Sequence, residues 1–379
     1  MIRYAGKLAL QQRVLPIYRA PFFELLASTC KGGMSLFTGL PRPNEGVTTA
    51  QELQITNFKL GQNIHLFSGS LYLCYQRGLI DWLKDWNPDA LVMEANPRYL
   101  STSSAIRWMH QRGRPVIGWG LGAPPLNPLH FQRKWGESKG GVLAGFRQTR
   151  RLSFLNQFDA LIAYSQRGAE EYAALGFSTE RIFVAHNSVS PPLSSSLPER
   201  SSTFSRKPYI LFVGRLQARK RIDHLLRACA EMASEPRLVI IGDGPERNAL
   251  ESLAKDIYPN AEFIGAKHGA ELTPYFTEAD LFALPGTGGL AVQEAMSYGL
   301  PVIVAQGDGT QDDLVRKENG WQIPPDDLKA LVFTMRDALS DVARLRKMGE
   351  ESYRIVVEEI NIEKMVEAFI KALNLITGK

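Results

Sequence analysis

The chain has few cysteines and no long apolar segment. Its three cysteines, Cys30, Cys74 and Cys229, are odd in number and far apart in the sequence. They therefore match neither a disulfide framework nor a zinc site, and they favour a reducing cytoplasm. No run of about 18 apolar residues occurs, which excludes a bilayer-spanning helix. The N-terminus also lacks an apolar core followed by a small-residue cleavage site, so we expect no export.

The composition is that of a soluble globular protein with unevenly distributed charge. The chain has 379 residues, of which 44% are hydrophobic and 22% charged. This length exceeds one comfortable core, so we expect two domains. Residues 1–200 carry 22 Lys and Arg against 13 Asp and Glu, a net charge of +9, whereas the remainder carries −4. A basic N-terminal half and a mildly acidic C-terminal half indicate two units with different partners.

Part of the basic charge is concentrated in FQRKWGESKGGVLAGFRQTRRL, residues 131–152. Its cations are interleaved with aromatic and aliphatic side chains. One hypothesis is that this segment docks on anionic lipid head groups or on a phosphorylated acceptor, which would place a cytoplasmic protein at the inner face of the membrane. The alternative is a solvated helix face beside a loop. We expect no nucleic-acid partner.

Short apolar runs recur through both halves, separated by segments long enough for a helix. The runs are ALVMEA (90–95), PVIGWG (115–120), ALIAYS (160–165), IFVAHN (182–187), YILFVG (209–214), LVIIGDG (238–244) and LFALP (281–285). Short runs bounded by Gly, Pro or Asn are typical of buried parallel strands with helical crossovers, so the predicted fold class is α/β. Ligands in such sheets bind at the carboxyl ends of the strands.

Two segments suggest how the chain is divided. The stretch SVSPPLSSSLPERSSTFSRKP (188–208) is rich in Ser and Pro and is typical of a linker. We therefore expect one domain over residues 1–200 and a second over residues 201–355. The final stretch INIEKMVEAFIKALNLI (360–376) has apolar residues at helical spacing and predicts an amphipathic helix.

The most informative segment is LFALPGTGGLAVQEAMSYGLPVIVA (281–305), which predicts a buried strand, a glycine-rich turn, a short helix and a second buried strand. Gly286, Gly288 and Gly289 allow backbone amides to approach a ligand, and the helix N-terminus that follows favours an anion. Glu294 lies one turn inside the helix, where it can accept hydrogen bonds from hydroxyls. This pattern suggests a nucleotide or nucleotide-sugar, and the alternative is an ordinary strand-to-helix turn with a solvated glutamate.

A second turn, VGRLQARKRIDHLL (213–226), carries cations at a strand end. Arg215 follows Gly214, and Lys220 lies near the start of the next helix. Arg as a bidentate fork and Lys as a point charge can neutralise a diphosphate. On its own the segment favours a basic helix start over a functional site, but a second phosphate-binding turn in the same predicted sheet favours the functional interpretation.

The order of these elements resembles the nucleotide-binding domain of the retaining glycosyltransferases of family 4, which have the GT-B fold. The matching segments are VGRLQARK (213–220), LVIIGDGPERNALE (238–251), FIG (263–265), EADLFALPG (278–286) and EAMSYGLPVI (294–303). The resemblance covers about residues 160–325 and is weak over residues 1–150. It implies two Rossmann-like, doubly wound parallel-sheet domains that face a cleft, with residues 356–379 packing back on the first.

The resemblance also implies roles by position. Arg215 and Lys220 would hold the donor diphosphate and offset charge on the leaving group, which makes them the expected catalytic residues. Glu294 would take the ribose hydroxyls. The other expected donor-binding residues are Gly214, Gly286, Gly288, Gly289, Leu290, Ala291, Phe263, Ile264 and Gly265.

The chain departs from the family pattern in three places. The family usually has two glutamates eight positions apart, and the first falls here on Gly286. RAPFFELL (19–26) stands where an N-terminal glycine pair is usual, and Trp119 lies in a segment where a histidine often follows a strand. The residues that we expect to line the acceptor cleft of the first domain are Arg19, Gly120 and Gly122.

The function implied by the resemblance is transfer of a sugar, with retained anomeric configuration, from a nucleoside-diphosphate-sugar to an acceptor hydroxyl. The basic half suggests a glycan or lipid-linked acceptor in polysaccharide or glycolipid synthesis. No aspartate pair follows a strand in a metal-holding context, and Asp312 and Asp313 are typical of a solvated helix start. We therefore expect cations in place of Mg²⁺, with no metal and no cofactor.

Two other hypotheses remain open. Gly286 in place of a glutamate leaves room for a non-catalytic relative that binds a nucleotide-sugar or a partner. GTGGLA (286–291) also satisfies the dinucleotide fingerprint, and Asp308 follows at about the spacing of a ribose-binding acid, as in an NAD-dependent dehydrogenase. Against the dehydrogenase, that fingerprint usually lies in the first strand-helix unit of its domain.

Overall fold

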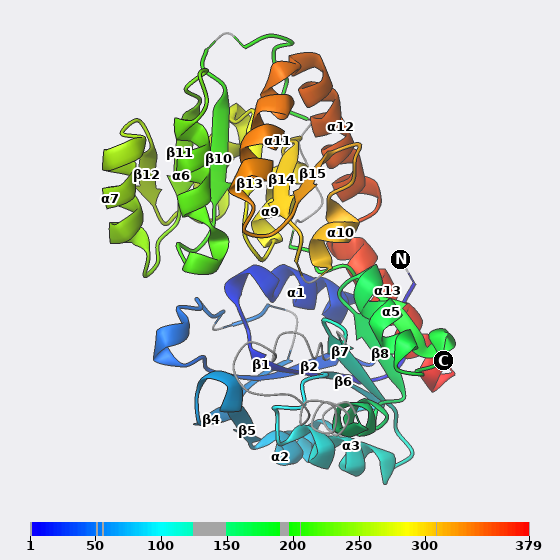
Figure 1. The fold of residues 1–379 in the computed structure, drawn as a ribbon. Coiled ribbons are helices and arrows are strands. Elements are labelled where there is room, and N and C mark those ends of the chain that lie inside the picture. The colour runs from blue at the N-terminus through cyan, green and yellow to red at the C-terminus, as the bar shows by residue number, and fades with distance from the viewer. Residues whose placement is uncertain are drawn as a thin grey trace, which may run out of the picture. The chain divides into compact units, whose positions relative to one another are not determined.

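The computed structural model describes residues 2–50, 52–54, 57–123, 149–189, 197–204, 206–307 and 309–378. Two compact units make up the chain (Figure 1). Unit 1 comprises Met1–His186 together with Ile362–Lys379, and unit 2 comprises Asn187–Asn361. Most of the basic segment 131–152, and Asp308, lie outside the described residues. In the described part of the chain, no helix combines the length and the apolar character needed to cross a membrane.

Unit 1 is built on a seven-stranded parallel sheet in the order β3-β2-β1-β6-β7-β8-β9. Its strands are β1 (Leu8–Val14), β2 (Met34–Gly39), β3 (Asn57–Leu60), β6 (Ala90–Glu94), β7 (Val116–Gly120), β8 (Ala160–Ala163) and β9 (Ile182–Val184). A separate antiparallel hairpin is formed by β4 (Gln62–Leu66) and β5 (Leu73–Arg77).

Helices cover both faces of the unit 1 sheet. They are α1 (Ala20–Thr29), α2 (Leu79–Trp86), α3 (Thr102–His110), α5 (Gln166–Ala174) and α13 (Ile362–Thr377). One apolar core joins α1 and α13 to the sheet, and a second joins α2 and α3 to the opposite face. The last helix of the chain thus belongs to the first sheet: the ring of Phe369 lies 5.1 Å from Phe22 and 5.0 Å from Trp119, between ring centroids.

Unit 2 has a six-stranded parallel sheet in the order β12-β11-β10-β13-β14-β15. Its strands are β10 (Tyr209–Val213), β11 (Arg237–Ile241), β12 (Glu262–Gly265), β13 (Leu281–Leu284), β14 (Val302–Ala305) and β15 (Gly320–Ile323). Its helices are α6 (Ile222–Ala230), α7 (Arg247–Ile257), α8 (Thr273–Glu278), α9 (Leu290–Ser297), α10 (Thr310–Leu314), α11 (Leu328–Ser340) and α12 (Val342–Glu358).

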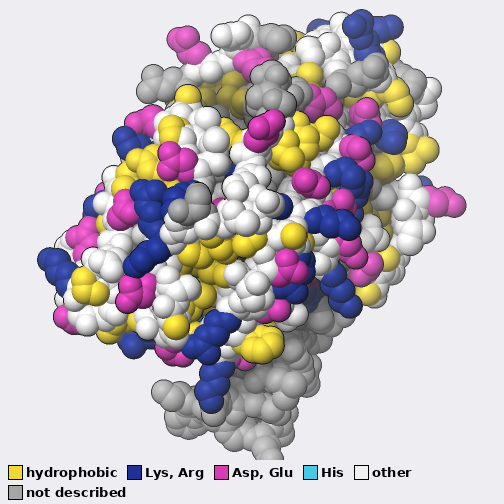
Figure 2. Space-filling model, turned by 90° about the horizontal axis from the view of Figure 1, so that it is seen from above, with side chains coloured by type: hydrophobic (Ala, Val, Ile, Leu, Met, Phe, Trp, Pro, Cys, Tyr) yellow, Lys and Arg dark blue, Asp and Glu magenta, His cyan; other side chains and the backbone are white. Residues whose placement is uncertain are grey.

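The central strands of unit 2 are apolar on both faces, because helices pack on either side of the sheet. All five residues of β10 and all four of β13 and β14 are buried. The prediction of two α/β units with parallel sheets is confirmed. Over the surface that Figure 2 shows, basic and acidic side chains are interspersed.

Candidate functional site

The carboxyl ends of β10 and β13 meet at one edge of the unit 2 sheet, because these strands are parallel neighbours. The loop after β10 ends in a short 3₁₀ turn, Ala218–Lys220, that buries Lys220. The Lys220 ammonium donates to the carbonyl oxygen of Thr287 at 2.6 Å, and the Thr287 amide donates to the carbonyl oxygen of Arg219 at 3.0 Å. The structure therefore joins the two turns that the sequence singled out.

The glycines of the second turn are needed for this close approach. A Cβ atom on Gly286 would lie 2.5 Å from both Cα and the carbonyl carbon of Lys220, where no side chain fits. Gly288 has a φ of +93°, which glycine adopts at little cost, and its Cβ would lie 2.8 Å from the Lys220 Nζ atom. Gly289 is roomier, because the nearest atom to its Cβ would be 3.5 Å away.

Glu294 lies in α9, which begins directly after this turn. Its carboxylate is partly buried and has no ion-pair or hydrogen-bond partner among the residues that the structure describes. Burial raises the pKa of Glu294 to about 7. A partly buried carboxylate without a partner beside a glycine-rich turn is a vacant acceptor for ligand hydroxyls.

The remaining predicted donor-site residues lie along the same edge of the sheet. Arg215 follows Gly214 at the end of β10 and is partly buried. Phe263, Ile264 and Gly265 form β12, where all three are partly buried. β12 pairs with β11 and not with β10, so its residues lie two strands away from Lys220.

Gln311 is a residue of this edge that the sequence did not single out. It lies in α10, which follows β14, the strand beside β13. Its side chain is fully buried, and within the described residues its Nε2 atom has no hydrogen-bond partner. That nitrogen would lie 3.5 Å from a Cβ atom on Gly289, at the N-terminus of α9. The order of the strands could have indicated Gln311, because β14 is a third neighbouring strand whose carboxyl end lies at this edge.

In unit 1, Arg19 lies in an aromatic pocket. Only 9% of its surface is exposed, and its guanidinium lies 4.9 Å from the ring centroid of Trp119 and 5.5 Å from that of Tyr164. Cation–π contact and burial hold this charge at the start of α1, directly after the 3₁₀ turn Ile17–Arg19.

The predicted glycine turn of unit 1 is packed against α5. The amide of Gly122 donates to the Tyr172 hydroxyl at 3.2 Å. A Cβ atom on Gly120 would lie 2.9 Å from that hydroxyl, and one on Gly122 would lie 2.5 Å from a carboxylate oxygen of Glu171. These glycines thus allow α5 to approach the end of β7.

Glu94 is a second residue that the sequence did not single out. It ends β6, between β1 and β7, and its carboxylate accepts a hydrogen bond from the backbone amide of Arg13 at 2.5 Å. Burial raises the pKa of Glu94. The Arg13 side chain pairs instead with Glu45 at 2.9 Å. The strand ends of unit 1 thus hold charges of both signs.

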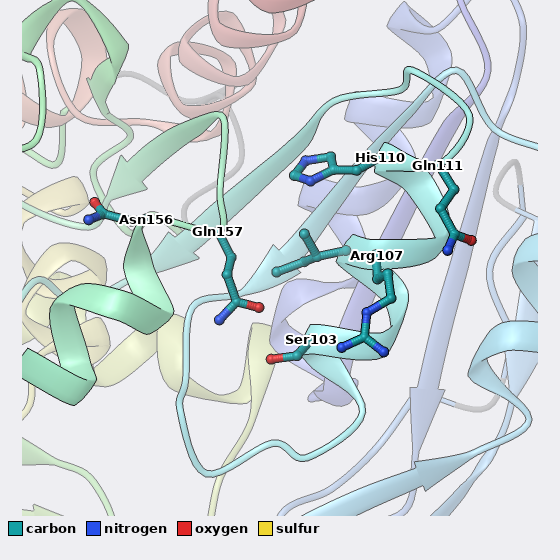
Figure 3. A pocket seen from close by; sticks show the side chains of 7 residues that line it. Ser103, Arg107, His110, Gln111, Asn156 and Gln157 are labelled. Carbon is teal, nitrogen blue, oxygen red and sulfur yellow. The ribbon is translucent and has the colours of Figure 1, made fainter.

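A cavity of about 500 Å³ lies elsewhere in unit 1, along α3 (Figure 3). Its lining residues are Ser103, Ile106, Arg107, His110, Gln111, Asn156 and Gln157. His110 contacts Asp159 at 2.9 Å, and the same Asp159 oxygen accepts a hydrogen bond from Val116, the first residue of β7. This part of the cavity is therefore at the amino end of the strand, opposite the edge where ligands of such sheets bind.

Comparison with known proteins identifies unit 2. Residues 195–355 match the family model described as Glycosyl transferases group 1. Unit 2 is therefore similar to a group 1 glycosyl transferase domain. All the predicted donor-site residues lie within this domain. Among the residues that the structure describes, no group of three or more His, Cys, Asp or Glu side chains is arranged to hold a metal ion.

Two related proteins are similar to different fractions of this chain. A sulfoquinovosyl transferase of Arabidopsis thaliana is 35% identical over 141 residues, which are 36% of this chain and 27% of that protein. A lipopolysaccharide core biosynthesis glycosyltransferase of Rhizobium meliloti is 22% identical over 302 residues, which are 77% of this chain and 87% of that protein. The chain thus spans about a quarter of the first relative and most of the second.

The solved structures show the fold of both units. The crystal structure of HepE from Anabaena in complex with UDP aligns with a TM-score of 0.69 at 15% identity, covering 97% of this chain and 99% of HepE. This likeness includes unit 1, which the family model does not reach. The predicted GT-B fold is confirmed.

Proposed function

We propose that this protein is a retaining glycosyltransferase that moves a sugar from a nucleoside-diphosphate-sugar to an acceptor hydroxyl. The observation that carries the proposal is the junction of two turns at one edge of the sheet: Lys220 is buried against the Gly286–Gly289 turn, and Glu294 follows with no partner among the described residues. A cation, a helix N-terminus and a hydroxyl acceptor are the groups that a nucleoside diphosphate requires.

The chemistry assigned to these residues is stabilisation of the leaving group. When the bond between sugar and diphosphate breaks, negative charge grows on the diphosphate. Lys220 and Arg215 would offset that charge, and the backbone amides at Gly289, Leu290 and Ala291 would donate hydrogen bonds to it. Because fixed cations supply the positive charge, we propose that transfer needs no metal ion and no cofactor.

We assign the acceptor to unit 1. Arg19 at the start of α1 is the cation proposed to face it, with Gly120 and Gly122 shaping the adjacent turn. The names of relatives include lipopolysaccharide core synthesis and a sulfoquinovosyl transferase. Together with the charge of +9 over residues 1–200, they support a glycan or lipid-linked acceptor and peripheral contact with a membrane.

The other hypotheses have less support. The dinucleotide fingerprint at 286–291 follows β13, which is preceded in the chain by β10, β11 and β12 of the same sheet. It is thus not in the first strand-helix unit of its domain, which disfavours a dehydrogenase. A non-catalytic relative would bind a nucleotide-sugar but release no nucleoside diphosphate with any acceptor, so a turnover assay separates it from the enzyme.

The test of donor binding is thermal stabilisation by UDP, GDP, ADP and dTDP, followed by their sugars. One nucleotide at 100 times its dissociation constant should raise the free energy of unfolding by about 2.7 kcal/mol. Glu294→Gln should abolish most of that stabilisation, because the amide replaces one acceptor oxygen by a donor. Stabilisation by NAD alone would favour the dehydrogenase, and an unchanged Glu294→Gln variant would contradict the ribose assignment.

The pH dependence of stability and of nucleotide affinity gives a second test of Glu294. The pKa of Glu294 is raised to about 7, so the folded protein keeps this proton when the unfolded chain has lost it. Without ligand, its contribution to stability should fall as the pH rises from about 4.5 to about 7. Nucleotide affinity should rise over the upper part of that range, because the ionised carboxylate is the better acceptor. Neither change should occur in Glu294→Gln.

Gln311→Met tests separately how the buried Gln311 amide affects the stability of the protein and its affinity for a ligand. Without ligand, the variant should be as stable as the wild type or more so, since it removes a buried donor that has no partner among the residues the structure describes. If the amide serves the distal phosphate, affinity should fall about tenfold for the nucleoside diphosphate and remain unchanged for the monophosphate. Equal losses for both, measured by calorimetry, would contradict this role.

A further inference from the structure

The β4–β5 hairpin of unit 1 has an apolar outer face. In its register, Ile64 lies opposite Tyr75 and Leu66 opposite Leu73. The exposed fractions are 37% for Ile64, 38% for Leu66 and 44% for Tyr75. Side chains alternate along a strand, so these residues share one face. In a hairpin that packs on a protein core, the solvent face is normally the polar one.

The opposite face is polar and is anchored to the rest of unit 1. Asn63 donates to the carbonyl oxygens of Arg13 at 2.7 Å and Leu40 at 2.9 Å. Gln76 is buried, and its side chain donates to Asn63 at 3.0 Å. A shift of register by one residue would break these bonds, so the anchors specify which face is exposed.

The apolar surface continues beyond the strands. Phe67 and Leu71, in the connection between β4 and β5, are 71% and 72% exposed. An isolated parallel bridge joins Tyr99 to Cys74, both of them buried, and the neighbouring Arg98 and Leu100 are exposed. We call this surface the outer hairpin face; it comprises Ile64, Leu66, Phe67, Leu71, Leu73, Tyr75 and Leu100.

The hairpin and the segments beside it carry exposed cations, and Glu45, a carboxylate close to His65 and Tyr72, is paired with Arg13 and Arg42. The sequence has no Asp or Glu between Glu52 and Asp81. Lys59, Arg77 and Arg98 are exposed. An exposed apolar tip next to exposed cations, with the nearby Glu45 carboxylate already paired, matches an interface of acyl chains and anionic head groups. The net charge of +9 over residues 1–200 has the same sign.

We propose that the outer hairpin face docks unit 1 on an anionic lipid bilayer, with Phe67 and Leu71 entering the boundary between head groups and acyl chains. Arg77 and Arg98 would remain at the level of the phosphates. The assignment deepens the proposed membrane contact by naming its surface. It does not depend on transferase chemistry, because vesicle binding is measured without sugar donor or acceptor.

The experiment is co-sedimentation of the full chain with vesicles of phosphatidylcholine, with and without phosphatidylglycerol. We expect binding only to the anionic vesicles. Phe67→Asn/Leu71→Gln should lower the partition coefficient by about tenfold or more. Asn suits position 67 because the backbone there has a φ of 59°. Arg77→Gln should lower binding about fivefold and weaken its dependence on salt.

The matched control is Phe333→Asn, which removes an aromatic side chain of α11 in unit 2 that is 74% exposed. It should bind vesicles like the wild type. The proposal fails if the wild type does not bind anionic vesicles, or if the Phe67/Leu71 variant, folded by circular dichroism, binds like the control. A wild-type dimer that this variant dissociates would assign the surface to a second copy of the chain instead.

Discussion

Lys220→Ala should lower the rate of sugar transfer about 100- to 1000-fold. Lys220 is 8% exposed, and its ammonium is held at the junction of two turns, where the proposed diphosphate leaves. A fixed charge in a site shielded from water stabilises developing negative charge strongly, and removal of one such donor commonly costs a factor of this size. The measurement is kcat with the donor nucleotide-sugar that the stabilisation screen identifies.

Lys220→Ala should also lower nucleotide affinity. Because Lys220 donates to the carbonyl oxygen of Thr287, its loss also releases the Gly286–Gly289 turn. We expect nucleotide affinity to fall about tenfold, less than the rate. Lys220→Arg should not restore transfer, because a guanidinium is larger than the space beside Gly288.

Arg219→Ala is the matched control. Arg219 is the preceding residue, is exposed, and has a weaker contact, 3.4 Å from its Nη1 atom to the Thr287 hydroxyl. Its loss should change transfer by less than about threefold. A Lys220→Ala variant with wild-type kcat would contradict the assignment of Lys220 as a catalytic residue.

Gly286→Glu should destabilise unit 2 and abolish nucleotide binding, although it introduces the glutamate that the family resemblance leads one to expect. The Cβ atom alone would lie 2.5 Å from backbone atoms of Lys220. Backbone atoms cannot move aside as the end of a flexible side chain can, so the turns must separate. Overpacking of this kind costs about 3 kcal/mol or more.

The measurement is the midpoint of thermal unfolding, which should fall by roughly 6–12 °C for a unit of this size. Gly286→Ala should show most of the loss, because the conflict begins at Cβ. The matched control is Gly289→Ala, whose Cβ would have its nearest neighbour at 3.5 Å and which should unfold within about 2 °C of the wild type. A stable, active Gly286→Glu variant would show that the two turns are not joined.

The substitution at 286 thus has a structural reason. In this protein the loop after β13 passes directly over the 3₁₀ turn Ala218–Lys220, and Gly286 is buried there. The missing glutamate follows from the path of this loop. Recognition of the proposed donor sugar would therefore depend on other groups at the same edge, among which Gln311 has an amide nitrogen without a partner in the described residues.

Hydrophobic periodicity alone could not predict every strand of the fold. β1 is an inner strand of the unit 1 sheet, between β2 and β6, but its sequence LALQQRV carries two glutamines. Both are buried: Gln11 bonds to the side chain of Gln76, and the carbonyl oxygen of Gln12 accepts a bond from the same side chain. A buried polar residue is acceptable only with a partner, and that partner lies more than 60 residues away in the chain.

The sequence by itself determined the class of the fold and the edge of the sheet at which we propose that the donor binds. Apolar strands, helical spacing and glycines at strand ends are local properties, so they can be read without the structure. Tertiary structure alone decided that Lys220 meets Thr287, that no side chain fits at Gly286, and that the β4–β5 hairpin turns its apolar face outward. These depend on atoms brought together from distant parts of the chain, for which local pattern carries no information.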